Sequence, residues 1–334
     1  MPELTWRTLR AADALAWAAL MRAIPHRDRP VDHVETAEFV RNLTAPGVDE
    51  ADSMGVFAGP ELVGCSIVLP TADGNRCDVE GGVHPGHRGQ GLGGRLLDWA
   101  VARVAQRSPQ PQRVGVWCAE HNDAHRKLLA RRGLRPSLHY HEVYSRLETV
   151  APLPAPSLPG GLELRHYTTD LDEAVRAAHN DAFSGQHEDG HVDRERWRRD
   201  FTGCASFLPE LSFVVLDARG VVAAHLLSYA HDASPHTTGQ RDLKVEYIGT
   251  RPGFRGRFLD RVLLAENDRV ARERGYVGMA FSVDSANPTG ALRVFERIGV
   301  YDPERDDCTT WVLHEGVPLG PEPGAAVAAE GGRA

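Results

Sequence analysis

The sequence predicts an α/β (α+β) protein of two tandem domains, each with a mixed central sheet flanked by helices. Three observations carry this prediction. A glycine-rich turn between a strand-like and a helix-like segment, Val83–Leu97, returns later in the chain as Thr250–Asp260. Short apolar strand patterns and helical patterns alternate around both copies, as in layered α/β folds. Four prolines within residues 150–161 separate the copies and disfavour both helix and sheet there.

The spacing of the repeat indicates a duplicated domain. Arg88 and Arg255 are 167 residues apart, and Gly133 and Gly299 are 166 apart. Repeats of this size are domains rather than solenoid units, and 334 residues suit two domains of ordinary size. We expect an N-terminal domain over 1–149, a stiff linker over 150–161, a C-terminal domain over 162–315 and a disordered tail over 316–334.

Both halves are expected to fold in the same order: an opening strand, an Ala-rich helix, a hairpin, a strand, the motif helix, a buried strand, a second helix and a closing hairpin. The N-terminal strands are expected at Leu4–Leu9, Met54–Phe57, Leu62–Leu69 and Arg113–Cys118. Their C-terminal counterparts are expected at Leu162–Tyr167, Phe213–Leu216, Val221–Leu227 and Val277–Val283.

Composition and charge narrow the class of protein. No run of about eighteen apolar residues exists, so we expect no contact with a membrane, and the N-terminus lacks the layout of a signal peptide. The net charge of -8 argues against a nucleic-acid partner and leans toward a cationic acceptor. Five scattered cysteines without a Cys-x-x-Cys pair fit a reducing, cytoplasmic location.

The turn Arg88–Gly94 has the features of a phosphate receptor. Glycines let backbone N–H groups converge where a side chain would block them. The helix that follows begins with unpaired N–H groups and a positive dipole end. The Walker ending Gly-Lys-Ser/Thr is missing, and the dinucleotide fingerprint fits only loosely. A glycine-rich turn without a ligand is the alternative, which the arginine directly before the glycines disfavours.

Two motifs together resemble the GNAT N-acetyltransferase superfamily. Val83–Gly93 matches its acetyl-CoA-binding pattern Val-x-Pro-x-x-Arg-Gly-x-Gly-x-Gly, and Asn122–Leu134 is similar to its second motif. The resemblance implies an acyltransferase that moves an acetyl group from acetyl-CoA, as cosubstrate, to a primary amine of a small molecule by direct attack in a ternary complex. The coenzyme-binding residues that it implies are Val83, Arg88, Gly89, Gln90, Gly91, Leu92, Gly93, Gly94 and Asn122.

The chemistry requires a base, because a protonated amine cannot attack a thioester. In many GNAT enzymes a glutamate on the strand before the loop has this role, and the resemblance places it at Glu80. The alternative for this residue is a solvated strand carboxylate. We expect a backbone N–H near Val83 to polarise the thioester carbonyl.

The general acid is left open by the sequence. The tyrosine of the family falls at Leu129, so its hydroxyl is missing. A thiol with a pKa of about 8.5 gives a tolerable leaving group, which makes an acid dispensable. His125, one turn earlier on the same helix face, and Tyr140 on the closing strand are the candidate substitutes.

The second copy of the loop replaces two glycines of the acetyl-CoA-binding pattern. Phe258 stands where Gly91 stands, and Asp260 where Gly93 stands. Phenylalanine lacks the backbone freedom of glycine and would fill the space of a phosphate. A carboxylate ~4 Å from a phosphate charge costs on the order of 4 kcal/mol at an effective dielectric near 20. We therefore predict that the C-terminal half does not bind acetyl-CoA in the usual way, although Arg255 survives there.

Asn180–Glu188 resembles a segment of the mycothiol synthase family, tandem GNAT enzymes whose C-terminal half is catalytic. Here the intact loop lies in the N-terminal half, so we expect a tandem relative that binds the coenzyme there. One alternative is a mycothiol-synthase-like enzyme that uses its C-terminal domain. Another is a non-catalytic protein that binds or sequesters acyl-CoA, which the missing tyrosine motivates. No metal is expected, because no His-Glu-x-x-His or tetrahedral ligand set occurs.

Overall fold

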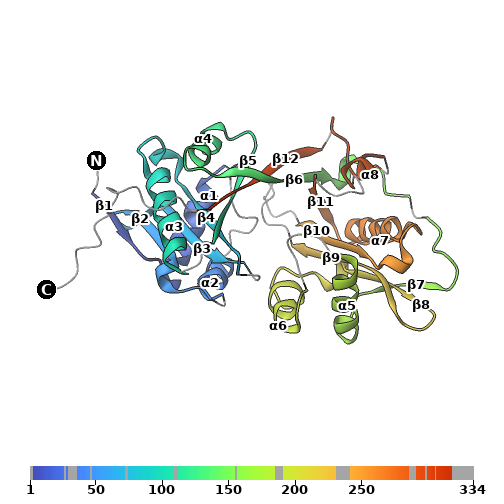
Figure 1. The fold of residues 1–334 in the computed structure, drawn as a ribbon. Helices are drawn as coiled ribbons and strands as arrows, with labels where there is room; N and C mark the ends of the chain where they lie inside the picture. Colours follow the sequence, from blue (N-terminus) through green and yellow to red (C-terminus); the bar gives the residue numbers. More distant parts are fainter. Residues whose placement is uncertain are drawn as a thin grey trace. The chain divides into compact units, whose positions relative to one another are not determined.

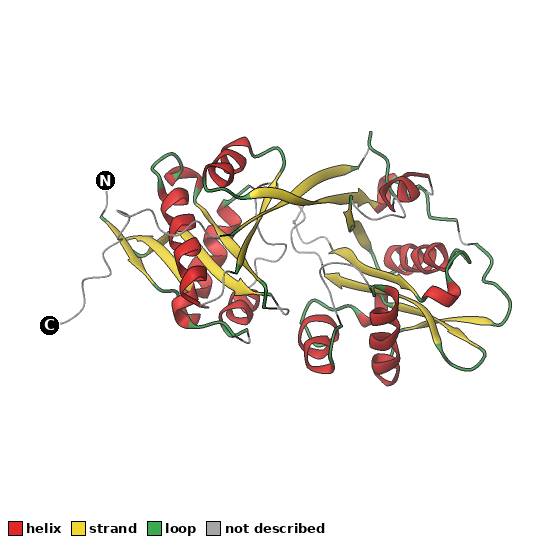
Figure 2. Ribbon diagram, in the orientation of Figure 1, coloured by secondary structure: helices red, strands yellow, loops and turns green. Residues whose placement is uncertain are grey.

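The computed structural model describes residues 3–25, 28, 36–45, 47–71, 74–107, 112–154, 156–184, 191–230, 241–285, 291–297, 299–304 and 306–317. The chain packs as two units: unit 1 comprises residues 1–139 and 311–334, and unit 2 comprises residues 140–310. In each unit helices flank a mixed sheet (Figure 2), which confirms the predicted α/β class.

Unit 1 has the strand order β1-β2-β3-β4-β5-β12. Its elements are β1 (Leu4–Arg7), α1 (Ala14–Ala23), α2 (Thr36–Leu43), β2 (Ser53–Ala58), β3 (Glu61–Pro70), β4 (Arg76–Val83), α3 (Leu92–Arg107), β5 (Arg113–Ala119), α4 (Asp123–Arg131) and the end of β12 (Asp307–Gly316). Strands β1 to β4 pair antiparallel, and β4 pairs with β5 in parallel. The predicted hairpin around Gly59 is confirmed as β2 and β3, with this glycine at φ +62°.

Helices cover both faces of the unit 1 sheet because residues of each strand alternate between the faces. On one face, α1 and α2 meet through Trp17 and Phe39, whose ring centroids lie 5.3 Å apart. On the other face, α3 buries Leu97, Ala100 and Val104 against β4 and β5. The face covered by α1 and α2 carries the even-numbered residues of β4, which positions the site described below.

Unit 2 has the strand order β6-β11-β10-β9-β8-β7. Its elements are β6 (Arg135–Arg146), β7 (Leu162–His166), α5 (Asp172–Ala182), α6 (Arg194–Arg196) with a π-helical turn (Trp197–Thr202), β8 (Phe213–Asp217), β9 (Val222–Ala230), β10 (Arg241–Thr250), α7 (Leu259–Glu273), β11 (Tyr276–Asp284) and α8 (Ala291–Arg297) (Figure 1). Helix α7 packs on one face, and α5 with the π-helical turn packs on the other.

The last strand of each unit comes from the other half of the chain. In unit 1, Trp311–Gly316 of β12 pairs antiparallel with β5. In unit 2, Tyr140–Arg146 of β6 pairs antiparallel with β11. The expectation of closing hairpins is wrong: each closing segment is one long strand, and neither contains the Gly, Asn or Pro pair that would turn it mid-way. The packed units therefore differ from the contiguous halves that the repeat suggested.

Parts of the linker and tail are described. Residues 150–154 and 156–161 form neither helix nor strand, and the Leu153 N–H donates to Asp268 Oδ2 at 3.0 Å. Gly316, where the tail was expected to start, is the last residue of β12. Residues 318–334 lie outside the described residues, as do residues 185–188 of the segment Asn180–Glu188. No helix in the described ranges has the length and apolar character needed to cross a bilayer.

Candidate active site

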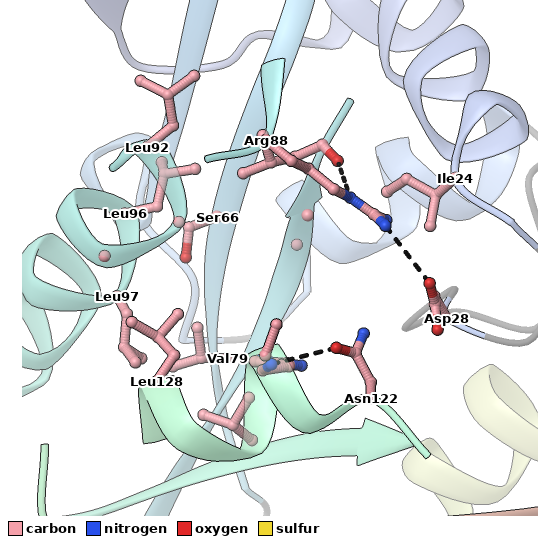
Figure 3. Close-up of a pocket in the computed structure, with 18 of the residues that line it drawn as sticks. Ile24, Asp28, Ser66, Val79, Arg88, Leu92, Leu96, Leu97, Asn122 and Leu128 are labelled. Carbon is pink, nitrogen blue, oxygen red and sulfur yellow. Dashed lines mark hydrogen bonds and ion pairs between the residues drawn. The ribbon is translucent and has the colours of Figure 1, made fainter. Parts of the chain in front are cut away.

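Strands β4 and β5 part toward their C-terminal ends and open the sheet of unit 1. They pair only where Arg76–Asp78 faces Arg113–Gly115. Beyond these residues β4 continues to Val83 and β5 to Ala119. A cavity of about 520 Å³, the unit 1 cavity, lies at this opening between strands. Figure 3 shows Leu92, Leu96 and Leu97 of α3 along one side of it and Ile24 and Asp28 along the other.

The glycine-rich loop forms one wall of the unit 1 cavity. Gly89 and Gly91 have φ of +76° and +79°, in the left-handed region that favours glycine. Because α3 begins at Leu92, the N–H groups of its first turn have no partner within the helix. Eight of the nine predicted coenzyme-binding residues line the cavity: Val83, Arg88, Gly89, Gly91, Leu92, Gly93, Gly94 and Asn122. The ninth, Gln90, is exposed.

Arg88 already holds an anion beside the loop. Its Nη1 lies 3.4 Å from Asp28 Oδ2, and its Nε donates to the Val83 carbonyl at 3.4 Å (Figure 3). Asp28 is shared with His121, whose Nε2 lies 2.9 Å from Oδ1. A carboxylate and a phosphate are both anionic acceptors of guanidinium hydrogen bonds. The position of Arg88 therefore suits a phosphate at the mouth of the loop.

Glu80 lines the same cavity from β4, where it faces Ile67 of β3. The Asn42 side chain on α2 donates from Nδ2 to Glu80 Oε2 at 3.1 Å. Sequence reasoning missed Asn42, because it lies in a helix without any motif and 38 residues before Glu80. Asp78, on the same strand face, is instead tied to Arg76, with Nε 2.8 Å from Oδ1.

The backbone of β4 offers a hydrogen-bond donor at the opening. The His84 N–H donates to the Val63 carbonyl at 2.9 Å, toward β3. Because successive N–H groups of a strand point to opposite sides, the Val83 N–H points away from β3. That is the side from which β5 has separated.

The two candidate acids lie in different units. His125 lines the unit 1 cavity, and burial lowers its pKa to about 4. Its imidazole is therefore neutral at pH 7. A neutral imidazole is a poor proton donor to a thiolate, so the lowered pKa does not favour the expected role of general acid. Its backbone N–H donates to Asn122 Oδ1 at 3.1 Å, which caps α4. Tyr140 lies in unit 2 on β6, opposite Asp284.

The second loop corrects one expectation. Phe258 does adopt the left-handed conformation, with φ +57°, although we expected phenylalanine to be unable to replace glycine there. The penalty for a non-glycine residue is about 1–2 kcal/mol. Phe258 is 59% exposed, and the centroid of its ring lies 4.8 Å from the guanidinium carbon of Arg261, so packing tolerates the side chain on the surface. Asp260, in place of a glycine, is the second residue of α7, which begins at Leu259.

The site shows no arrangement typical of a metal centre. Within the described ranges, no group of three or more His, Cys, Asp or Glu side chains is placed to hold an ion. All five cysteines are free thiols. The groups assembled at the cavity are instead a glycine-rich loop, a carboxylate and an opened strand edge, which is the set expected of an acyltransferase.

Comparisons with known proteins agree with this class. Residues 17–134 match the model of the acetyltransferase (GNAT) family. Mycothiol acetyltransferase of Thermobispora bispora is 30% identical to this chain, in an alignment that covers 73% of this chain and 78% of the relative. Mycothiol acetyltransferase of Frankia alni is 26% identical, and the alignment covers 92% of this chain and 95% of the relative. A tandem GNAT protein from the clavulanic acid biosynthesis pathway superposes with a TM-score of 0.73 at 20% identity, covering 96% of this chain and 100% of its own. The chain belongs to the GNAT acetyltransferase family and is an acyltransferase, which confirms the predicted family.

Proposed function

We propose that this enzyme transfers an acetyl group from acetyl-CoA, bound in the unit 1 cavity, to a primary amine of a small molecule. The observation that carries the proposal is the meeting of the glycine loop, Arg88 and Glu80 at the opening between β4 and β5. The loop N–H groups and Arg88 suit the pyrophosphate. The unpaired backbone of the two strands offers partners to the amides of the pantetheine arm.

In this proposal Glu80 accepts the proton of the incoming ammonium, directly or through water. The amine nitrogen then attacks the thioester carbonyl, and the Val83 N–H stabilises the oxyanion that forms. The carbon–sulfur bond breaks and releases a thiolate, whose conjugate thiol has a pKa of about 8.5. The second proton, which the nitrogen still carries after the attack, passes through water to this thiolate and leaves a neutral amide. Asn42 holds the Glu80 carboxylate through the hydrogen bond at 3.1 Å.

The acceptor is proposed from charge and from the relatives. Glu80 and Asp28 both line the cavity, which favours a cationic acceptor such as an amino sugar or a polyamine. The name of the relatives, mycothiol acetyltransferase, makes a mycothiol-related amine the first acceptor to test. The five free thiols favour a reducing, cytoplasmic location as the place where the enzyme acts.

Calorimetric titration of the full chain with acetyl-CoA tests the proposal. We expect one site per chain, lost in Gly91→Phe because the ring would occupy the phosphate space beside free helix N–H groups. The matched control is Phe258→Gly in unit 2, which should leave both affinity and stoichiometry unchanged. Two sites in the parent protein would place a coenzyme in unit 2 as well. No binding at all would overturn the proposed function.

Acetyl transfer itself is tested by release of free thiol with a panel of amines that begins with mycothiol-related compounds. Acceptor-dependent thiol release that is absent in Gly91→Phe would support the proposal. Coenzyme binding without turnover on any amine would favour a protein that binds or sequesters acyl-CoA.

A further inference from the structure

Helix α4 presents two cations to the unit 1 cavity. Ala124, Lys127, Leu128 and Arg131 all line it, and their spacing of three and four residues places them on one helix face. Lys127 and Arg131 are exposed, and within the described part of the chain no hydrogen bond or ion pair engages their charged groups. Like charges at i and i+4 on a helix repel modestly, so this pair does not stabilise the free protein.

Neighbouring cations, by contrast, are engaged. Arg95 stacks 4.1 Å over the ring of Trp6. On α4 itself, Arg126 Nη1 lies 3.3 Å from Asp123 Oδ1 and donates to a backbone carbonyl at 3.1 Å. Just beyond α4, Arg132 makes two contacts with Asp98, at 2.5 and 2.8 Å. Lys127 and Arg131 therefore stand out as the cavity-lining cations of this helix whose charge is available to a ligand.

Their place in the fold puts them close to the loop. A Cβ atom built on Gly93 would lie 3.7 Å from Leu128 Cδ2, and one on Gly94 would lie 3.8 Å from Leu128 Cδ1. The first turn of α3 and the middle of α4 are therefore in near van der Waals contact at Leu128. Lys127 adjoins this contact, and Arg131 follows one turn later along the cavity-facing side of α4.

We propose that Lys127 and Arg131 form a binding site for a phosphomonoester, the 3′-phosphate on the ribose of the coenzyme. The inference rests on the proposed function, because acetyl-CoA carries this group in addition to the pyrophosphate that the loop and Arg88 suit. A phosphomonoester carries about -1.5 to -2 charges at pH 7. It removes the repulsion between the two cations and accepts hydrogen bonds from both.

Two ligands that differ only at this group test the site. We titrate the full chain with acetyl-CoA and with acetyl-dephospho-CoA, which lacks the 3′-phosphate. The parent protein should bind acetyl-CoA about tenfold more tightly, the scale of one charge-assisted hydrogen bond in a solvent-exposed setting. The double variant Lys127→Met, Arg131→Met should lose this preference, while its affinity for acetyl-dephospho-CoA stays that of the parent.

The matched control is Arg126→Met, on the same helix but paired with Asp123, which should retain the preference. Equal affinity of the parent for the two ligands would overturn the site. A double variant that binds both ligands more weakly, by the same factor, would also overturn the site. The two cations would then act on the pyrophosphate or through the overall electrostatic potential of the cavity. A parent that binds neither ligand would overturn the proposed function, and the phosphomonoester site with it.

Discussion

The loops of unit 1 and unit 2 share a backbone and differ in their surroundings. Gly91 and Phe258 occupy equivalent positions, and both have left-handed φ values, +79° and +57°. Arg88 and Arg255 each donate from Nε to the carbonyl five residues earlier, at 3.4 Å in both units. The turn has therefore kept its shape through duplication, even where its sequence no longer requires glycine.

The strands beside the two loops differ much more. Glu80 of unit 1 lines a cavity. Its equivalent in unit 2, 167 residues later, is Tyr247, which stacks on Phe201 with ring centroids 4.9 Å apart. Behind it lie two buried histidines, His179 and His225, with Nδ1 and Nε2 3.3 Å apart. The comparison teaches that the loop alone does not make a coenzyme site; the neighbouring strand and helices must leave room for one.

The largest effect is expected at the carboxylate that only unit 1 has. Glu80→Gln removes the proposed base, so kcat should fall by about 10²–10⁴. Affinity for acetyl-CoA, measured by calorimetry, should not change, because the amide is nearly isosteric. The unit 2 counterpart Tyr247→Phe should leave kcat unaltered. If Glu80→Gln kept full turnover, the base would have to be sought elsewhere.

The next effect tests the loop glycine that unit 2 has replaced with Asp260. Gly93→Asp would bring a carboxylate to the phosphates, at a cost on the order of 4 kcal/mol, or about a thousandfold in acetyl-CoA affinity. The measurement is a competition titration that reaches weak affinities. The reverse change, Asp260→Gly combined with Phe258→Gly, should create no second site. A second site in that variant would show that the loop alone is sufficient.

The buried histidine pair predicts a pH dependence of unit 2. Burial, together with the charge of Arg196, lowers the pKa of His179 to about 4, and burial lowers that of His225 as well. The folded state therefore favours neutral imidazoles, so stability is complete above pH ~6.5, the unfolded value, and falls as the pH drops toward 4. For His179 the loss is roughly 3 kcal/mol across this window.

Hydrogen exchange of unit 2 peptides between pH 7 and 4.5, corrected for intrinsic rates, measures this loss of stability. In the variant His179→Leu, His225→Leu the dependence should largely disappear. A dependence that persists in this variant would assign it to carboxylates rather than to the histidine pair.

The smallest effect is expected at Asn42, the positioning residue of Glu80. Asn42→Ala removes a hydrogen bond to an ionised carboxylate, worth about 1.5 kcal/mol, so kcat should fall roughly tenfold. The acid limb of the pH–rate profile should move to higher pH, because the lost bond favoured the charged form. Thr44→Ala, next to the end of the same helix, is the control without effect. An unchanged profile for Asn42→Ala would leave this residue a structural role only.

Much of the site follows from local sequence, because its chemistry is concentrated in one turn. The alternation of strand and helix patterns and the 167-residue offset predicted both sheets and the loop at Arg88. Asn42 was not predicted, since its contact with Glu80 depends on how α2 packs on the sheet. The conformation of Phe258 was missed because propensity is a preference that tertiary packing can override. Strand pairing of β6 and β12 was missed because alternation indicates a strand but not its neighbour.

The origin of the last strand of unit 1 has a consequence for synthesis on the ribosome. Ala119 ends β5 and Trp311 begins its pairing partner, so 192 residues (311 − 119) separate them. At ~5–20 residues per second, translation of that stretch takes about 10–40 s. During this interval β5 has an open edge, which is a template for pairing with another nascent chain. Folding of the unit that contains the cavity is thus completed only after all of unit 2, residues 140–310, has been translated.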